Sequence, residues 1–222
     1  MLRLTGGQVT FEQHQIEQFE PLFVDFIKAE MQQDLAHDVN HVLRVVKCAK
    51  ALCLKEGAKL EVVVPAAYLH DCFSLPKNHP DRAMSSQLAA EKAVSFLRHV
   101  GYPTDFYSEI SHAIETHSYS ANLKPKTLEA QIVQDADRLD ALGAIGIARC
   151  LQVSTSLGVN LYSNDDPFAV KRDLNDKQFC IDHFYVKLLK LAETMNTPTA
   201  AVEAQKRSEY MQTYLTQLAS EI

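Results

Sequence analysis

Apolar residues recur at intervals of three and four positions along most of the chain. Between residues 38 and 57, for example, Val42, Val45, Val46, Ala49 and Leu52 would lie on one side of a helix. This spacing is typical of an amphipathic helix that packs against a core. The same periodicity predicts helices over about residues 11–27, 38–57, 60–72, 83–100, 104–117, 127–140, 142–157, 177–195 and 198–220.

Residues that favour helix ends mark several of these boundaries. Asp38 is a predicted N-cap and Gly57 a predicted stop, because a carboxylate accepts hydrogen bonds from free N–H groups and glycine tolerates left-handed backbone. Thr104 is predicted to cap the helix that follows it, and Thr127 is predicted to begin another helix. Pro21 is expected to bend or break the first helix.

The segment from Leu60 to Cys72 is apolar on nearly all sides, which predicts a central helix. Pro65 within it is expected to be acceptable only in an early turn. The apolar run ends in the adjacent pair His70 and Asp71. An unpaired charge under apolar cover costs several kcal/mol in roughly any estimate, and a divalent metal ion would relieve that cost.

Composition supports an all-α fold. The 222 residues include only 7 glycines and 8 prolines, which leaves little room for strands joined by tight turns. We expect one domain over residues 1–222, with a helical core at about 20–150 and C-terminal helices at about 174–221 packed on it. Residues 158–173 are rich in Gly, Asn, Asp and Pro and predict a long loop that could cover a pocket as a lid.

The charge balance limits the classes of partner. The formal net charge is −6, with no large basic face evident, which argues against binding to a nucleic-acid polymer. A small anionic substrate would need a local cluster of Lys and Arg, or a metal ion.

The five cysteines suggest buried thiols in a reducing compartment. Their number is odd and no two of them form a C-x-x-C pair. The sequence has no apolar run near the roughly 20 residues of a membrane span and no signal-peptide pattern. We therefore expect a cytoplasmic protein without a membrane partner, and we leave its oligomeric state open.

Four side chains form a candidate metal site: His41, His70, Asp71 and Asp137. Two imidazoles and two carboxylates suit Mn, Mg, Co, Ni, Fe or Zn and leave coordination positions for water and substrate. There are 28 residues between His41 and His70 and 65 between Asp71 and Asp137. These separations exclude a compact finger-like site, so the ligands must converge from three helices.

The order His, His-Asp, Asp on a chain of helices resembles the HD-domain metal-dependent phosphohydrolase superfamily. The wider context resembles one bacterial branch, the YedJ/YpgQ-like HD proteins, from about residue 20 to the C-terminus. The segments that carry the resemblance are Asp38-x-x-His41, Leu69-His70-Asp71, Leu75-Pro76-Lys77-Asn78-His79-Pro80-x-Arg82, His117-Ser118-Tyr119-Ser120 and the run from Gln134 through Asp137 to Gly146.

This resemblance implies hydrolysis of a phosphate ester or phosphoric anhydride, with a nucleotide as the expected substrate. It also assigns the metal-ligand role to His41, His70, Asp71 and Asp137, around one divalent ion. The chemistry agrees, because a bound metal ion can activate water and neutralise charge that develops on phosphoryl oxygens.

Candidates for proton transfer are His117 and Asp140. His117, with Glu115 and His112 on the same predicted helix, is a general acid or base or a substrate contact, or else a helix-end histidine bonded to backbone. Asp140 could orient a metal ligand or Arg138, or form a simple helix salt bridge.

Candidate substrate-binding residues are Lys77, Asn78, Arg82 and Arg138. Lys77 and Arg82 flank the loop that begins a few residues after His70-Asp71, within reach of phosphates on a bound metal. The alternative is that they are solvated loop charges. His79 is a weaker candidate on the same loop.

Two other functions fit the same ligand set. One is a non-catalytic metal or nucleotide sensor. The other is a dinuclear HD phosphodiesterase or oxygenase, for which His112 and His117 are the available extra ligands. The sequence leaves open the exact substrate, the bond that is broken and the metal.

Overall fold

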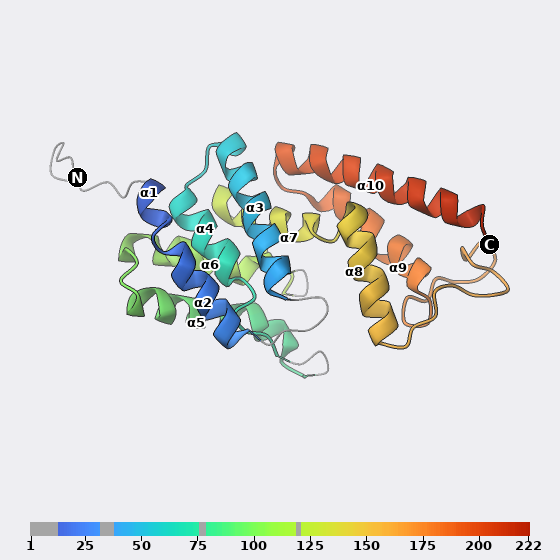
Figure 1. Ribbon diagram of the computed structural model, residues 1–222, viewed down its shortest axis with the longest axis horizontal. Coiled ribbons are helices and arrows are strands. Elements are labelled where there is room, and N and C mark those ends of the chain that lie inside the picture. The colour runs from blue at the N-terminus through green and yellow to red at the C-terminus, as the bar shows by residue number, and fades with distance from the viewer. Residues whose placement is uncertain (1–12, 32–37, 76–78, 119–120) are drawn as a thin grey trace.

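The computed structural model describes residues 13–31, 38–75, 79–118 and 121–222, and within these ranges the protein is built from helices, as predicted. Figure 1 shows α1 to α7 gathered at the N-terminal side, with α8, α9 and α10 at the C-terminal side. Among the described residues the nearest approach to a sheet is an isolated bridge between Asn160 and Phe179. The helices are α1 (Gln13–Ile16), α2 (Glu20–Glu30), α3 (Val39–Glu56), α4 (Leu60–Leu69), η1 (Arg82–Met84), α5 (Ser85–His99), η2 (Thr104–Phe106), α6 (Tyr107–His117), α7 (Leu128–Leu139), α8 (Gly143–Ser156), α9 (Cys180–Val186), η3 (Leu188–Thr194) and α10 (Pro198–Ala219).

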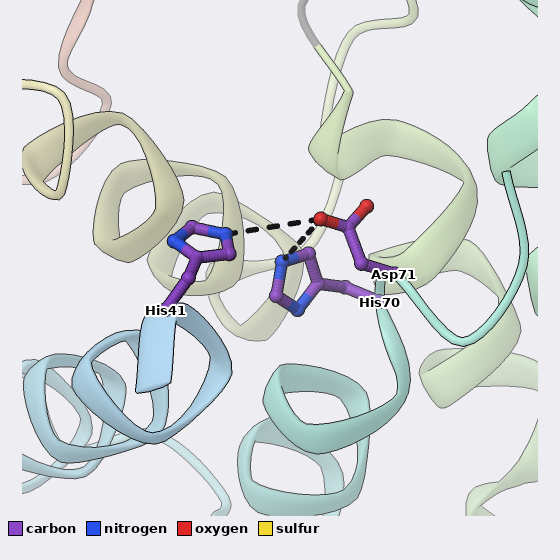
Figure 2. Close-up of side chains that lie close together, drawn as sticks. All are labelled: His41, His70 and Asp71. Carbon is purple, nitrogen blue, oxygen red and sulfur yellow. Dashed lines mark ion pairs between the residues drawn. The ribbon is translucent and has the colours of Figure 1, made fainter. Parts of the chain in front are cut away.

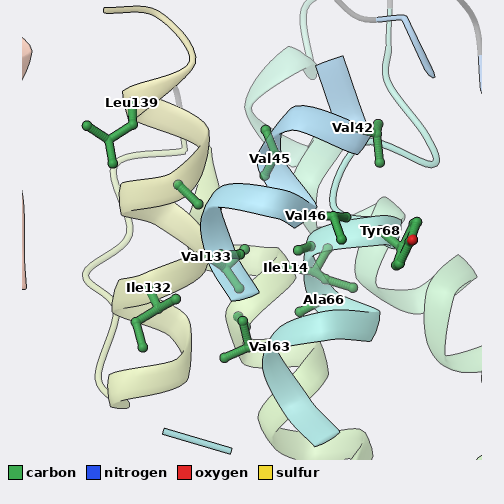
Figure 3. Close-up of a cluster of buried hydrophobic side chains, with 14 of the residues drawn as sticks. Val42, Val45, Val46, Val63, Ala66, Tyr68, Ile114, Ile132, Val133 and Leu139 are labelled. Atoms are coloured by element: carbon green, nitrogen blue, oxygen red, sulfur yellow. The ribbon is translucent and has the colours of Figure 1, made fainter. Parts of the chain in front are cut away.

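Helix α4 lies at the centre of the N-terminal group and packs against α1, α2, α3, α5, α6 and α7. Every residue from Val62 to Leu69 is buried, as the apolar pattern predicts. Figure 3 shows Val63 and Ala66 of α4 against Val46 of α3 and Ile114 of α6. Because neighbouring helices contact α4 on several sides, they fix the position of its C-terminal end, which His70 and Asp71 follow.

Two predictions about α4 need correction. Pro65 lies inside the helix rather than in an early turn. Proline cannot donate to the carbonyl four residues before it, and here the hydroxyl of Tyr102 donates to that carbonyl, of Glu61, at 2.7 Å. The helix also ends at Leu69, so that His70 and Asp71 occupy the turn that follows.

The predicted helix-end residues are confirmed at Asp38 and Gly57, and Thr127 caps the helix that it was predicted to begin. Asp38 accepts from the backbone N–H of His41, Thr127 accepts from that of Ala130, and Gly57 has a φ of 72°. Thr104 is the exception, because it begins the short helix η2, and α6 follows from Phe106 without a side-chain cap. Pro21 lies in the first turn of α2, after the break that separates α1 from α2.

The C-terminal part differs from prediction in one respect. The helix expected over residues 177–195 is divided into α9 and η3, with Lys187 at φ −130° between them. Helix α10 then packs on α8, η3, α7 and α3. Asp135 of α7 holds the start of α10, since its carboxylate accepts from the backbone N–H groups of Asn196 and Thr197.

The predicted long loop connects α8 to α9. Its fold depends on Asp182, which accepts from the guanidinium of Arg172 at 2.5 and 2.8 Å and from the backbone of Asn175. All five cysteines are free thiols. None of the helices in the described ranges has the length and apolar character needed to cross a membrane.

Candidate metal centre and adjoining cavity

The predicted ligands of α3 and α4 meet where these two helices lie side by side. His41 is in the first turn of α3, which Asp38 caps, and His70 and Asp71 follow directly after α4. Figure 2 shows both imidazoles directed toward the Asp71 carboxylate. The Nε2 atoms of His41 and His70 lie 3.7 and 3.5 Å from Asp71 Oδ2. One ligand atom from each residue falls within 4.8 Å of the other two.

Asp137 completes this cluster from the last turn of α7. Its Oδ1 lies 3.4 Å from His41 Nε2 and 3.9 Å from His70 Nε2. Two imidazole nitrogens and two carboxylates therefore converge on one small volume, from α3, from the turn after α4 and from α7. We call His41, His70, Asp71 and Asp137 the ligand cluster.

The ligand cluster fits a divalent cation. Nδ1 of His70 lies 2.8 Å from the carbonyl oxygen of Ala67, so Nδ1 carries the proton and Nε2 keeps its lone pair. That buried Nε2 has no hydrogen-bond partner among the described residues, an arrangement that is costly unless the atom binds something. The 3.4–3.9 Å separations within the cluster exceed those of most N–H···O hydrogen bonds. Mixed nitrogen and oxygen ligands of this kind suit a divalent metal ion.

Asp140 supports the cluster from behind His41. Its Oδ2 accepts from Nδ1 of His41 at 2.7 Å, which directs Nε2 of the same ring toward Asp71 and Asp137. Arg44 and Arg149 both bind the Asp140 carboxylate, at distances of 2.8 and 2.9 Å. A carboxylate that orients a metal-binding histidine in this way is a common supporting feature of metal sites.

The charges of the cluster stabilise one another. Burial opposes the charged form of His41, yet the nearby carboxylates of Asp137 and Asp140 outweigh it and raise the pKa of His41 to about 9. Burial also opposes the charged form of Asp137, but His41 lowers the pKa of that carboxylate. Burial dominates at His70 and lowers its pKa. The carboxylates therefore need positive charge close by.

His117 lies at the edge of the ligand cluster. Its Nδ1 is 2.6 Å from the carbonyl oxygen of Ile114, and its Nε2 is 3.5 Å from Asp71 Oδ1. Burial works against the charged form, but the hydrogen bond with Asp71 outweighs burial and raises the pKa of His117. One ring nitrogen therefore bonds to the backbone, as one interpretation from the sequence expects. The other faces the cluster, the position that a role in proton transfer requires.

The other polar side chains of α6 point elsewhere. His112 accepts from the backbone N–H of Lys126, and Glu115 accepts from the hydroxyl of Ser111. The structure therefore does not bring His112 to the cluster.

A cavity of about 730 Å³ opens from the ligand cluster toward α8 and α9. Asp71, Asp137 and His117 line its inner end. Four cationic side chains also line it. They come from η1, from α8, from the loop before α9 and from the residue after α9: Arg82, Arg149, Lys177 and Lys187. Asp176 is the acidic side chain of the lining outside the inner end, where it pairs with His183. Asp71 and Asp137 at the inner end and four cationic side chains along the walls suit a metal ion together with an anionic ligand.

The predicted substrate-binding residues have different positions. Arg82 lines the cavity and donates a hydrogen bond to the carbonyl of Leu75. Arg138 is not brought to the cavity, because its guanidinium donates to the carbonyl of Thr194 at 2.6 Å. Lys77 and Asn78 lie outside the described residues. His79 accepts from the backbone N–H of Asp81 within its own loop.

Sequence reasoning missed Arg149, Lys177 and Lys187. A signal for Arg149 was available, because it follows Gly146 by three positions and precedes Val153 by four on α8, which places all three on one helix face. Lys177 and Lys187 gave no such signal, since each lies just outside α9 and reaches the cavity through the path of the chain.

Comparison with known proteins agrees with this geometry. The family model of the HD domain matches residues 38–142, which contain the whole ligand cluster. The uncharacterized protein YpgQ of Bacillus subtilis is 34% identical over 190 residues, or 84% of each chain.

Solved structures show the same fold. The crystal structure of Bacillus subtilis YpgQ in complex with ADP is 31% identical, with a TM-score of 0.71 over 93% of this chain and 96% of that one. An HD-superfamily hydrolase from Bacillus thuringiensis is 32% identical, with a TM-score of 0.70 over 93% and 97% of the two chains. With the ligand cluster and these similarities together, the chain belongs to the HD-domain family, within the HD superfamily of hydrolases.

Proposed function

We propose that the protein is a metal-dependent phosphohydrolase that acts on a small phosphorylated molecule, a nucleotide. One observation carries the proposal: a single cavity has Asp71 and Asp137 of the ligand cluster at its inner end and Arg82, Arg149, Lys177 and Lys187 along its walls. A phosphate group is the anion that both halves of such a cavity can bind, the metal by charge and Arg by paired hydrogen bonds.

HD domains bind divalent metal ions, and His41, His70, Asp71 and Asp137 are the residues that would hold one here. Such an ion supplies Lewis acidity for the phosphoryl oxygens and lowers the pKa of water. His117 lies beside Asp71, and its Nε2 can hold or accept a proton at the inner end of the cavity. Asp140 does not line the cavity, so we assign it the positioning of His41 rather than a direct part in proton transfer.

A nucleotide is the preferred substrate for two reasons. The cavity of about 730 Å³ is much larger than one phosphate group requires and falls within the usual size of small-molecule sites. The similar protein YpgQ has been crystallised with ADP. Analysis of the product shows which bond is broken: inorganic phosphate indicates removal of a terminal phosphate, and pyrophosphate indicates cleavage that releases pyrophosphate.

The test is a screen of the purified protein against nucleoside mono-, di- and triphosphates and simple phosphate esters with Mn, Mg, Co and Ni. We expect turnover that requires metal and disappears in His70→Ala and in Asp71→Asn. His99→Ala is the matched control, because His99 is exposed at the end of α5. Absence of turnover on every compound contradicts the proposal, and tight nucleotide binding without turnover would indicate a sensor instead.

A further inference from the structure

One face of α8 forms a continuous wall of the cavity. Arg149, Cys150, Val153, Ser154 and Leu157 line it, at the three- and four-residue spacing of a single helix face. With a rise of 1.5 Å per residue, this wall extends about 12 Å from Arg149 to Leu157. An elongated ligand can therefore lie along α8 with its two ends in different surroundings.

The chemistry of the wall changes along its length. Arg149 lies next to Asp140, which binds His41, so this end of the wall is beside the ligand cluster. Val153 follows one turn later and Leu157 two turns later, and Val159 lines the cavity just beyond the helix. Asp176, Lys177 and His183 also line the cavity, from the segment that pairs with Asn160 beside Val159. Phosphates match the first end, and a flat organic group with polar atoms at its edge matches the second.

Leu157 shows that this second end is open to a ligand. Its side chain is 62% exposed although it lines the cavity. Val153 and Val159 are partly buried beside it. Adjacent apolar side chains at the rim of a polar cavity are typical of a place where an apolar group of a ligand is covered.

We propose that Val153, Leu157 and Val159 form the subsite for the nucleobase of a nucleotide whose phosphates lie at the Arg149 end. We call these three residues the apolar rim. The assignment rests on the proposed function for the choice of a nucleotide. A base presents two apolar faces, which the rim can cover, and polar groups at its edge, for which Ser154 and His183 line the cavity nearby.

The test compares two ligands that share their charged part and resist hydrolysis. Adenosine 5′-(α,β-methylene)diphosphate carries the nucleoside, and methylenediphosphonate does not. Binding of both to the metal-loaded protein is measured by calorimetry for wild type, Leu157→Ala and Val159→Ala. Val170→Ala is the control, because Val170 is 81% exposed in the same loop and does not line the cavity.

We expect wild type to bind the nucleoside ligand more tightly than methylenediphosphonate. Each rim variant should weaken the nucleoside ligand by about fivefold to thirtyfold, from loss of apolar contact, and leave methylenediphosphonate unchanged. Equal binding of the two ligands to wild type, no binding of either, or variants that affect both ligands or neither overturns the assignment.

The result is independent of the hydrolysis screen, because neither ligand is turned over. A protein with no hydrolytic activity but a rim-dependent preference for the nucleoside ligand would contradict the proposed reaction and support the assignment of the apolar rim. An active enzyme without that preference would support the proposed reaction and contradict the assignment of the apolar rim. Thermal unfolding of the variants shows whether a loss of affinity comes from misfolding. Because Leu157 is exposed, its replacement by Ala should lower the stability of the fold only slightly.

Discussion

The carboxylate of Asp140 lies 2.7 Å from Nδ1 of His41, a residue 99 positions earlier in the chain. This contact joins the end of α7 to the first turn of α3 and directs Nε2 of His41 toward Asp71 and Asp137. Its effect on a metal site is to fix both the tautomer and the orientation of the ring.

Replacement of Asp140 by Asn should therefore weaken metal binding without removing a ligand. We expect metal affinity to fall by about 10- to 100-fold, because the ring of His41 loses its charged partner. Competition against a chelating dye measures this affinity. Asp25→Asn, on the exposed side of α2, should bind metal as wild type does. Equal affinities of the Asp140 variant and wild type would show that the contact has no role in the site.

Metal binding should stabilise the fold. An ion that binds only the folded state adds about 2.7 kcal/mol to the free energy of unfolding when its concentration is 100 times Kd. EDTA should thus lower the melting temperature of wild type. Asp71→Ala should show a lower melting temperature in metal and no change on chelation, whereas Asp105→Asn, exposed before α6, should behave as wild type. A metal-dependent shift retained in Asp71→Ala would place the ion elsewhere.

Asp135 should matter for folding and not for metal. It is fully buried, and its carboxylate accepts from the backbone and hydroxyl of Thr197 and from Asn196. Asp135→Ala leaves these donors unpaired and should lower the free energy of unfolding by about 3 kcal/mol or more. Metal content per folded chain should stay the same, and a loss of metal at full stability would reverse this assignment.

The loop between α8 and α9 should be sensitive to acid through Asp182. Burial opposes the charged carboxylate, but Arg172 and the backbone of Asn175 outweigh burial and lower the pKa of Asp182. A carboxyl whose pKa is lower in the folded state contributes stability above its unfolded pKa, near 3.9, and loses it as pH falls further.

Chemical unfolding measured between pH 7 and pH 3 tests this contribution. Wild type should lose stability below about pH 4, while Asp182→Asn should start about 3 kcal/mol less stable at pH 7, the lower end for a broken buried ion pair. The difference in free energy of unfolding between wild type and Asp182→Asn should become smaller as the pH falls below about 4. If that difference stays the same from pH 7 to pH 3, the Asp182 carboxylate does not contribute the pH-dependent stability that its contacts indicate.

Gly146 should be difficult to replace for steric reasons. A Cβ at this position would lie 2.3 Å from the carbonyl oxygen of Ala141, a backbone atom that cannot rotate away. Gly146→Ala should lower the free energy of unfolding by about 3 kcal/mol, since the start of α8 must shift. Gly158→Ala is the comparison, because its Cβ would meet nothing within 4 Å and its φ of +68° costs about 1 kcal/mol. Equal losses in the two variants would exclude the clash.

Much of the helical framework follows from the sequence. The three- and four-residue periodicity predicts α3, and Asp38 and Gly57 mark its ends, because caps depend on atoms a few residues away. The order of His41, His70, Asp71 and Asp137 also indicates the ligand cluster before any packing is known. The helix ends can be predicted because they depend on local interactions. The ligand cluster can be predicted because buried histidine and aspartate side chains have few functions other than metal binding or catalysis.

Tertiary structure decides the contacts between helices that are distant in the chain. The hydroxyl of Tyr102 reaches the carbonyl of Glu61 and allows Pro65 within α4. Arg149 reaches Asp140, whereas Arg138, which the sequence suggests for substrate, reaches Thr194. Each of these depends on how the helices pack and where loops place their side chains. Periodicity tells which face of a helix is buried, but the partner that the face meets is decided only when the core closes.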